Sequence, residues 1–214
     1  MPLDLRSGLF ALLLFAAVPA WAGAQREEAL SANVASAMRR SVTDANAPRL
    51  VFDDAREGQA WLAEMSHRLE KRIPDAWTRQ RLLTAIQYEA SRAGLDPQLV
   101  LGLIQVESGF KKYAVSGVGA RGLMQVMPFW VRHIGSNEHN LFELTTNLRY
   151  GCTILRHYLD IERGNLFRAL GRYNGSLGRP EYPNLVLGAW RAHWQWQPPA
   201  ALRTARLEAA PVQN

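Results

Sequence analysis

Apolar residues recur every three to four positions over most of this 214-residue chain, with polar residues between them. This spacing places the apolar side chains on one face of a helix. Segments rich in Gly, Pro, Ser or Asn separate the periodic stretches. Helices are predicted over residues 27–42, 56–72, 74–94, 97–107, 128–135, 146–162, 165–173 and 181–194. No internal repeat or strand-like alternation stands out, so the predicted fold class is all-α, with room for a small β element in the loops.

The predicted helix over residues 97–107 carries a charged residue on its apolar face. Asp96 suits the N-cap and Pro97 the first helical position. The apolar stripe consists of Leu99, Val100, Leu103 and Ile104. Glu107 takes the next position on that stripe, in the last turn before Gly109. Its carboxyl is therefore expected to point towards the core.

Two effects should raise the pKa of the Glu107 carboxyl. Burial disfavours the charged form, and so does the negative end of the helix dipole. A carboxyl that stays protonated near neutral pH can serve as the general acid of a glycosidase. Position alone does not establish this role, because a lone Glu near a helix end is more often solvated, or buried and paired with Arg or Lys.

The first 22 residues have the pattern of a secretory signal peptide. Arg6 supplies a basic start, residues 9–18 an apolar run, and Ala20-Trp21-Ala22 a cleavage site. The apolar run is short for a membrane anchor. We therefore expect export, and a location in the periplasm.

The net charge and the cysteine content indicate which classes of binding partner the chain is suited to. The net charge is +6 and the pI about 9.9. In an exported protein this charge fits the acidic cell wall or a membrane surface better than nucleic acid, although ordinary solubility explains it equally well. Cys152 is the single cysteine and is expected to be a buried small hydrophobic residue. No Cys/His spacing typical of zinc occurs, so no metal is predicted.

Three clusters complete the pattern around Glu107. They are Glu107-Ser108-Gly109-Phe110, the run from Gly119 to Pro128 (GARGLMQVMP), and Arg172-Tyr173-Asn174-Gly175. Together with Asn147, Gly151 and Leu155, they resemble the soluble-lytic-transglycosylase (SLT) family of peptidoglycan lyases, related to goose-type lysozyme. The resemblance covers about residues 82–190. It implies a lysozyme-like catalytic domain over residues 81–194, preceded by a helical extension over 25–80 and followed by a disordered tail over 195–214.

The resemblance also implies a role for each matching residue. Glu107 matches the single catalytic acid and base, and Tyr173 the tyrosine whose hydroxyl orients that glutamate. Gln125 and Asn174 match residues that bind the substrate sugar. Ser108 and Met124 match positions that line the cleft, although plain core packing is an equal reading for Met124, and helix-end packing is the alternative for Tyr173.

The chain departs from the family pattern in two places. Lys111-Lys112 stand where the family commonly has Asn-Pro, and Arg172-Tyr173-Asn174-Gly175-Ser176 stands where it commonly has Ala-Tyr-Asn-Ala-Gly. The first change adds positive charge beside the catalytic loop. Neither change removes a catalytic group, but both bear on substrate preference.

The chemistry implied by the resemblance requires one carboxyl rather than two. An ordinary glycosidase flanks the bond with two carboxylates, and the motif set contains none besides Glu107, since Glu143 and Glu181 are interpreted as a surface acid and a helix cap. The family cleaves the bond between N-acetylmuramic acid and N-acetylglucosamine without water and leaves a 1,6-anhydromuramyl end. No metal or organic cofactor is implied.

Other functions stay open on the sequence alone. A goose-type muramidase would use water and need a second acid, and a non-catalytic peptidoglycan-binding component of an envelope machine would keep the fold without the chemistry. A DNA-binding helical protein is suggested only by charge. Three roles stay open for the extension, namely bracing the core, gating the cleft and docking a secretion or pilus apparatus. The simplest expectation is that its apolar side chains pack on the catalytic core: Trp61, Leu62, Met65, Leu69 and Trp77.

Overall fold

A computed structural model describes residues 25–43 and 46–202 of the chain. Within these ranges the regular elements are helices, and the β structure consists of isolated bridges that join Arg121 to Val115 and to Val126. The elements are α1 (Ala32–Thr43), α2 (Ala55–Leu69), α3 (Ala76–Arg92), α4 (Pro97–Glu107), α5 (Phe129–Ile134), α6 (Leu144–Ile161), α7 (Leu166–Asn174), α8 (Glu181–Ala189) and a π-helix, η1 (Trp190–Trp194). The predicted all-α class is confirmed.

Aspartate caps start three successive helices. The side chains of Asp54, Asp75 and Asp96 each accept a hydrogen bond from a backbone N–H in the first turn of α2, α3 and α4. The capping role predicted for Asp96 is confirmed. Helix α1, in contrast, begins at Ala32, five residues later than predicted. The residues before it pair with other helices: Glu27 contacts His133 and Glu28 contacts Arg172.

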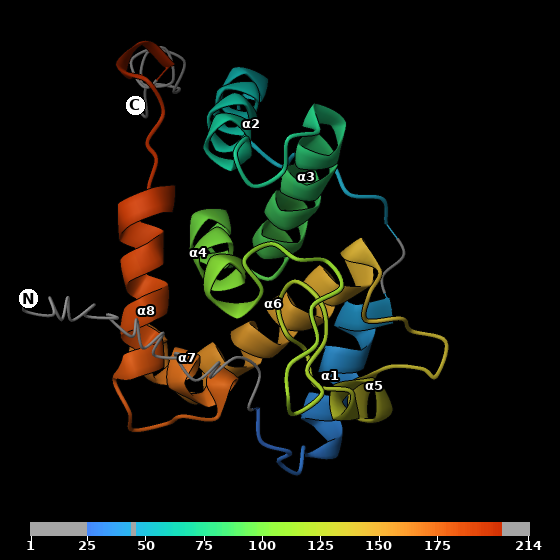
Figure 1. The fold of residues 1–214 in the computed structure, drawn as a ribbon. Coiled ribbons are helices and arrows are strands. Elements are labelled where there is room, and N and C mark those ends of the chain that lie inside the picture. The colour runs from blue at the N-terminus through green and yellow to red at the C-terminus, as the bar shows by residue number, and fades with distance from the viewer. Residues whose placement is uncertain (1–24, 44–45, 203–214) are drawn as a thin grey trace, which may run out of the picture.

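Helix α4 lies at the centre of the fold. Figure 1 shows α8 on one side of it and α3 and α6 on the other, and α4 contacts both α8 and α3. Residues 100, 101, 103 and 104 are completely buried. At Gly102 an added Cβ would lie only 2.9 Å from the backbone nitrogen of Trp190, so this glycine lets α4 approach η1 closely. The C-terminal end of α4 is thereby fixed from several sides.

A buried ion pair joins α3 to α6. Glu89 is fully buried, and its Oε1 lies 2.8 Å from a terminal nitrogen of Arg149. Its Oε2 accepts a 3.0 Å hydrogen bond from Arg92. Each carboxylate oxygen thus has a cationic partner, as a buried charge requires.

The N-terminal extension packs on the rest of the helical core, with one exception. Helix α1 contacts α5 and α6, and α2 contacts α3. Trp61, Met65 and Leu69 are buried and Leu62 is partly buried, as predicted. The prediction for Trp77 is wrong: its side chain, at the start of α3, is 63% exposed. The helical spacing turns Trp77 to the outer surface, where the guanidinium of Arg81 lies over its ring.

The first residues assigned to the tail are held against the core. The backbone N–H of Trp196 donates to the side chain of Gln98, and Arg68 donates to the carbonyls of His193 and Gln195. The disordered segment predicted from residue 195 therefore does not begin there. The predicted signal peptide and residues 203–214 lie outside the described residues. Among the helices that are described, none has the length and apolar character needed to cross a membrane.

Candidate active site

Glu107 is the last residue of α4 and is 5% exposed. Its Oε1 accepts a 2.5 Å hydrogen bond from the hydroxyl of Tyr182. Its Oε2 is buried and has no hydrogen-bond partner in the described part of the chain. Buried polar atoms are rarely left unpaired, so an unpaired carboxyl oxygen points to a functional group.

Burial sets the protonation of this carboxyl. Loss of water around the side chain raises the pKa of Glu107 from 4.5 to about 8, and the hydrogen bond from Tyr182 acts in the opposite direction. The pKa of Glu107 is thus raised, as the sequence predicts. At neutral pH Glu107 is therefore mainly a neutral acid with a proton to give.

Tyr182, and not Tyr173, makes the hydrogen bond to Glu107. Tyr182 stands in the first turn of α8 and is 3% exposed. The hydroxyl of Tyr173 donates instead to the carbonyl of Met124, at 2.7 Å. Tyr173 still lies close enough for the charge of Glu107 to help raise its pKa, after the larger effect of burial. The predicted orienting contact of Tyr173 is thus replaced by one to the loop of residues 113–128, which we call the catalytic loop.

Sequence reasoning missed Tyr182 because nothing in its local pattern marks it. It lies between Glu181 and Pro183 at a helix start, where an aromatic residue ordinarily packs on the core. Its contact spans 75 positions of sequence and depends on α8 packing against α4. Only the tertiary arrangement brings the phenol to the carboxyl.

The catalytic loop is fastened to α6 by one side chain. Asn147, 1% exposed, accepts from the backbone N–H of Met124 and donates to the carbonyls of Arg121 and Leu141. Gly122 has a φ of +74° and leaves no room for a Cβ, which would lie 2.4 Å from the Asn147 amide nitrogen. A Cβ at Gly151 would likewise meet the sulfur of Met124 at 2.4 Å. The loop therefore rests directly on α6.

The four residues predicted to bind substrate are all buried in this structure. Ser108 donates to the carbonyl of Leu123, and Gln125 donates to the carbonyls of Gly122 and Ala114, so both side chains shape the loop. Met124 is completely buried and packs against Gly151, which favours the packing interpretation over a cleft contact. Asn174 is 1% exposed at the end of α7. Direct contact of Ser108, Gln125 and Asn174 with a sugar stays a prediction.

Gln25 is a second residue that sequence reasoning did not single out. Its side chain is 5% exposed and reaches the catalytic loop 100 positions away. The Oε1 atom accepts from the indole N–H of Trp130 at 2.9 Å and from the backbone N–H of Met127 at 3.3 Å. The amide group donates to the carbonyl of Gln125 at 3.4 Å. The start of the extension thus supports the loop next to Glu107.

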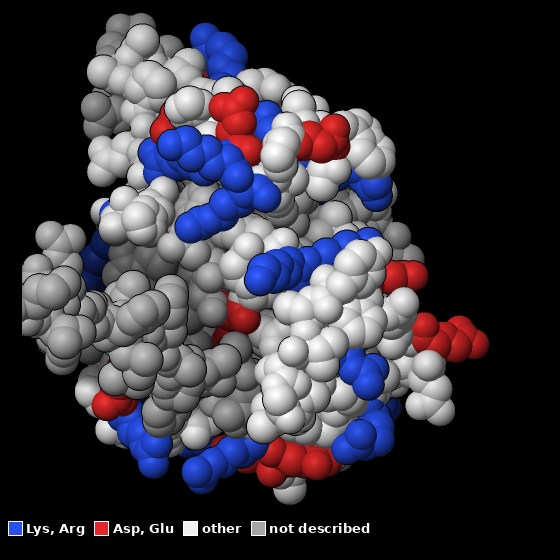
Figure 2. Space-filling view, in the orientation of Figure 1, with Lys and Arg blue, Asp and Glu red and all other residues white. Residues whose placement is uncertain are grey.

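The molecular surface around the site is hollowed and carries charged side chains. Figure 2 shows a hollow in the middle of the face drawn there, with an acidic group at its base and Lys and Arg side chains along its upper margin.

Among the described residues no three His, Cys, Asp or Glu side chains gather closely enough to hold a metal ion. Cys152 is buried, as expected, and burial raises the pKa of its thiol.

Comparison with known proteins shows which family the region around Glu107 matches. Residues 84–182 match the family model described as the transglycosylase SLT domain. A transglycosylase of Enterobacteria phage PRD1 is 37% identical over 93 residues, which cover 44% of this chain and 34% of the phage protein. Membrane-bound lytic murein transglycosylase C of Haemophilus influenzae is 32% identical over 115 residues, covering 46% of this chain and 32% of that protein.

Other matches are shorter or weaker. Membrane-bound lytic murein transglycosylase C of Histophilus somni is 51% identical over 49 residues, covering 23% of this chain and 14% of that protein. The chain thus spans about a third or less of the length of these relatives. The solved structure of lytic transglycosylase Slt from Pseudomonas aeruginosa, an inactive mutant, aligns over 80% of this chain and 36% of its own, with 18% identity and a TM-score of 0.42. That likeness is too low to place individual residues.

Proposed function

We propose that this chain, whose residues 84–182 belong to the SLT-domain family, is an exported peptidoglycan lytic transglycosylase with Glu107 as its sole acid and base. Its substrate is the β-1,4 bond between N-acetylmuramic acid and N-acetylglucosamine. The observation that carries the proposal is the state of the Glu107 carboxyl: buried, with a pKa near 8, and with one oxygen unpaired.

The geometry assigns a different task to each carboxyl oxygen. Oε1 is occupied by the hydroxyl that Tyr182 donates, so the acidic proton belongs on Oε2. No described residue accepts a hydrogen bond from Oε2, which leaves its proton for the glycosidic oxygen of a bound strand. Tyr182 fixes the rotamer of the carboxyl and acts as a positioning residue.

The reaction then proceeds in two steps with one protein group. Glu107 protonates the glycosidic oxygen, the C1–O bond breaks, and the acetamido carbonyl of the muramyl residue supports the positive charge at C1. The ionised Glu107 next takes the proton of the 6-hydroxyl, and that oxygen bonds to C1. The product is a 1,6-anhydromuramyl end, no water is consumed, and Glu107 regains its proton.

The environment of Glu107 supports a single carboxyl over a pair. A hydrolase with two carboxyl groups would place them on either side of the bond. Among the described residues, the other buried carboxylate is Glu89, which is held by Arg149 and Arg92 and belongs to the α3–α6 contact. Glu143 and Glu181 are exposed at helix starts. No specific observation favours the muramidase or the non-catalytic alternative.

The cellular setting follows from the same assignment. A peptidoglycan substrate and the signal pattern of residues 1–22 support a location in the periplasm. Association with a secretion or pilus apparatus stays a prediction.

The test is mass spectrometry of the fragments that the purified protein releases from peptidoglycan, with Glu107→Gln beside it. We expect 1,6-anhydromuramyl ends from the wild type and a loss of at least about 100-fold in the variant, the usual weight of a general acid. Circular dichroism serves as the control, because the amide keeps the shape of the carboxyl. Reducing muramyl ends would indicate a hydrolase, and unchanged turnover in the variant would refute the role of Glu107.

A further inference from the structure

Several cations lie over aromatic rings beside the catalytic loop. The guanidinium of Arg81 lies 4.4 Å from the ring centre of Trp77, and that of Arg72 lies 5.8 Å from Phe110. The ammonium of Lys112 lies 5.1 Å from the ring centre of Tyr113. Such contacts hold a cation in place without neutralising it. We call Arg72, Trp77, Arg81, Phe110 and Lys112 the basic aromatic face.

Three hollows run along this face. One of about 280 Å³ lies between Trp77, Phe110 and Lys112, and another of about 350 Å³ lies on the side of Trp77 nearer Pro48. A third, of about 520 Å³, is lined by Arg72 and the end of η1. Their charged lining residues are all basic: Arg68, Lys71, Arg72, Arg81 and Lys112. The face is therefore suited to an anion.

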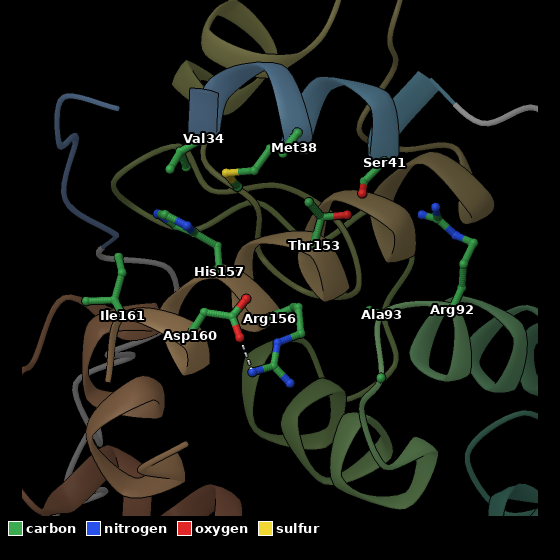
Figure 3. Close-up of a pocket in the computed structure, with 12 residues that line it drawn as sticks. Val34, Met38, Ser41, Arg92, Ala93, Thr153, Arg156, His157, Asp160 and Ile161 are labelled. Carbon is green, nitrogen blue, oxygen red and sulfur yellow. Dashed lines mark hydrogen bonds and ion pairs between the residues drawn. The ribbon is translucent and has the colours of Figure 1, made fainter. Parts of the chain in front are cut away.

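The Arg and Lys side chains of this face form no ion pair within the described part of the chain, whereas Arg68 at its margin is paired with Glu64. No described carboxylate lies within 4 Å of Lys71, Arg72, Arg81 or Lys112. Arg72 is oriented instead by a 3.1 Å hydrogen bond to the neutral side chain of Gln105. The hollow of about 720 Å³ between α1 and α6 offers a contrast, because Arg156 there is paired with Asp160 (Figure 3).

The basic aromatic face adjoins the catalytic acid. Phe110 and Lys112 follow Glu107 by three and five residues, and Leu123, which lines the same hollow, accepts a hydrogen bond from Ser108. Arg72, Trp77 and Arg81 lie before residue 84, where the match to the family model begins. Part of the face is therefore a property of this chain's extension.

We propose that the basic aromatic face binds the acidic peptide stem of the peptidoglycan strand; this rests on the proposed function. The peptide stem is attached to the lactyl group of the muramyl residue. Because C1 of the same residue is the reacting atom, the stem must begin next to Glu107. Its free carboxylates suit the unpaired Arg and Lys side chains, and its methyl and methylene groups suit the rings of Trp77 and Phe110. The face, formed partly by the extension and partly by the SLT domain, thus recognises the peptide while Glu107 acts on the sugar.

The test compares soluble, uncross-linked glycan strands before and after an amidase has removed their stems. The variant is Arg81→Gln/Lys112→Gln. The matched control, Arg40→Gln/Arg163→Gln, removes the same charge from exposed positions outside the face. On strands with stems we expect kcat/KM of the variant to fall about 5- to 20-fold, as two solvent-accessible charge contacts allow. On stripped strands and in the control, kcat/KM should stay at the wild-type value.

The outcomes separate this proposal from the proposed function. If the wild type releases no product from either substrate, the proposed function fails. If the wild type cleaves both and the variant matches the control on strands with stems, stem binding is refuted. An equal loss on stripped strands would mean that the face contacts the glycan or another polyanion, and it would refute stem binding as well. Added NaCl should raise the wild-type KM more on strands with stems, because salt screens exposed charges.

Discussion

The hydroxyl of Tyr182 donates a 2.5 Å hydrogen bond to Oε1 of Glu107, across 75 residues of sequence. This bond joins the first turn of α8 to the last turn of α4. It holds a carboxyl that burial keeps protonated near neutral pH. Tyr173 lies nearby but supports the backbone of the catalytic loop through the carbonyl of Met124. The two tyrosines therefore have separable roles.

Replacing each tyrosine by phenylalanine tests that separation. Tyr182→Phe leaves both oxygens of Glu107 without a partner among the described residues, and we expect turnover to fall about tenfold or more. Tyr173→Phe leaves the Tyr182–Glu107 hydrogen bond intact and removes the hydrogen bond to the carbonyl of Met124. It should therefore lower the free energy of unfolding by about 1 kcal/mol and affect turnover less. Kinetics and chemical denaturation of the two variants give the comparison. A larger loss of turnover in Tyr173→Phe would reverse the assignment.

The pH dependence of activity should report the same carboxyl. Glu107 must be protonated to act as the acid, and its pKa is about 8, so kcat/KM should decline above about pH 8. The hydrogen bond from Tyr182 lowers the pKa of Glu107. In Tyr182→Phe the residual activity should therefore decline at a higher pH. A decline near pH 4.5 in the wild type would contradict a buried, protonated Glu107.

Stability should depend on pH in the same range. The pKa of Glu107 is about 8 when folded and near 4.5 when unfolded, so between these values the folded state binds more protons. The stabilising effect of the protonated carboxyl is full below about pH 4.5 and is lost as pH rises through 8, with a slope of at most about 1.4 kcal/mol per pH unit. Glu107→Gln lacks this slope. Denaturation of both proteins from pH 5 to 9 isolates the effect, and parallel curves would rule it out.

Gln25 offers a test of the extension as a support for the catalytic loop. Gln25→Ala leaves the indole N–H of Trp130 and the backbone N–H of Met127 without their acceptor. We expect the free energy of unfolding to fall by about 1–3 kcal/mol, with reduced turnover. Glu28→Gln, in the same segment but at an exposed ion pair, is the control and should change little. Wild-type behaviour of Gln25→Ala would assign the segment a passive role.

The Glu89–Arg149 pair allows a comparison of buried and surface charges. Arg149→Leu leaves the fully buried Glu89 with Arg92 as its remaining cationic contact among the described residues, and the free energy of unfolding should fall by about 3–5 kcal/mol. Arg156→Gln disrupts a more exposed pair with Asp160 and should cost about 1 kcal/mol or less. Thermal and urea denaturation measure both. Equal losses would show that burial of Glu89 does not govern its contribution.

The helical class, the capped start of α4 and the position of Glu107 on its buried face could all be predicted from the order of residues. These features depend on local periodicity and on residues within one or two turns of each other. The motif set around residues 107–128 also pointed to the catalytic loop. Such features can be predicted from the sequence because they depend on residues that are close together along the chain.

The side chains that contact the Glu107 carboxyl could not be predicted in this way, because they depend on how the helices pack. Tyr182 and Gln25 reach the site from helix packing and from a segment outside the motif set, and their polar contacts span 75 and 100 or more positions. The exposure of Trp77 was likewise decided by how α3 turns against its neighbours. A hydroxyl, an amide or an indole has the same local signature whether it packs, caps or positions. Its role depends on the three-dimensional neighbours that folding brings to it.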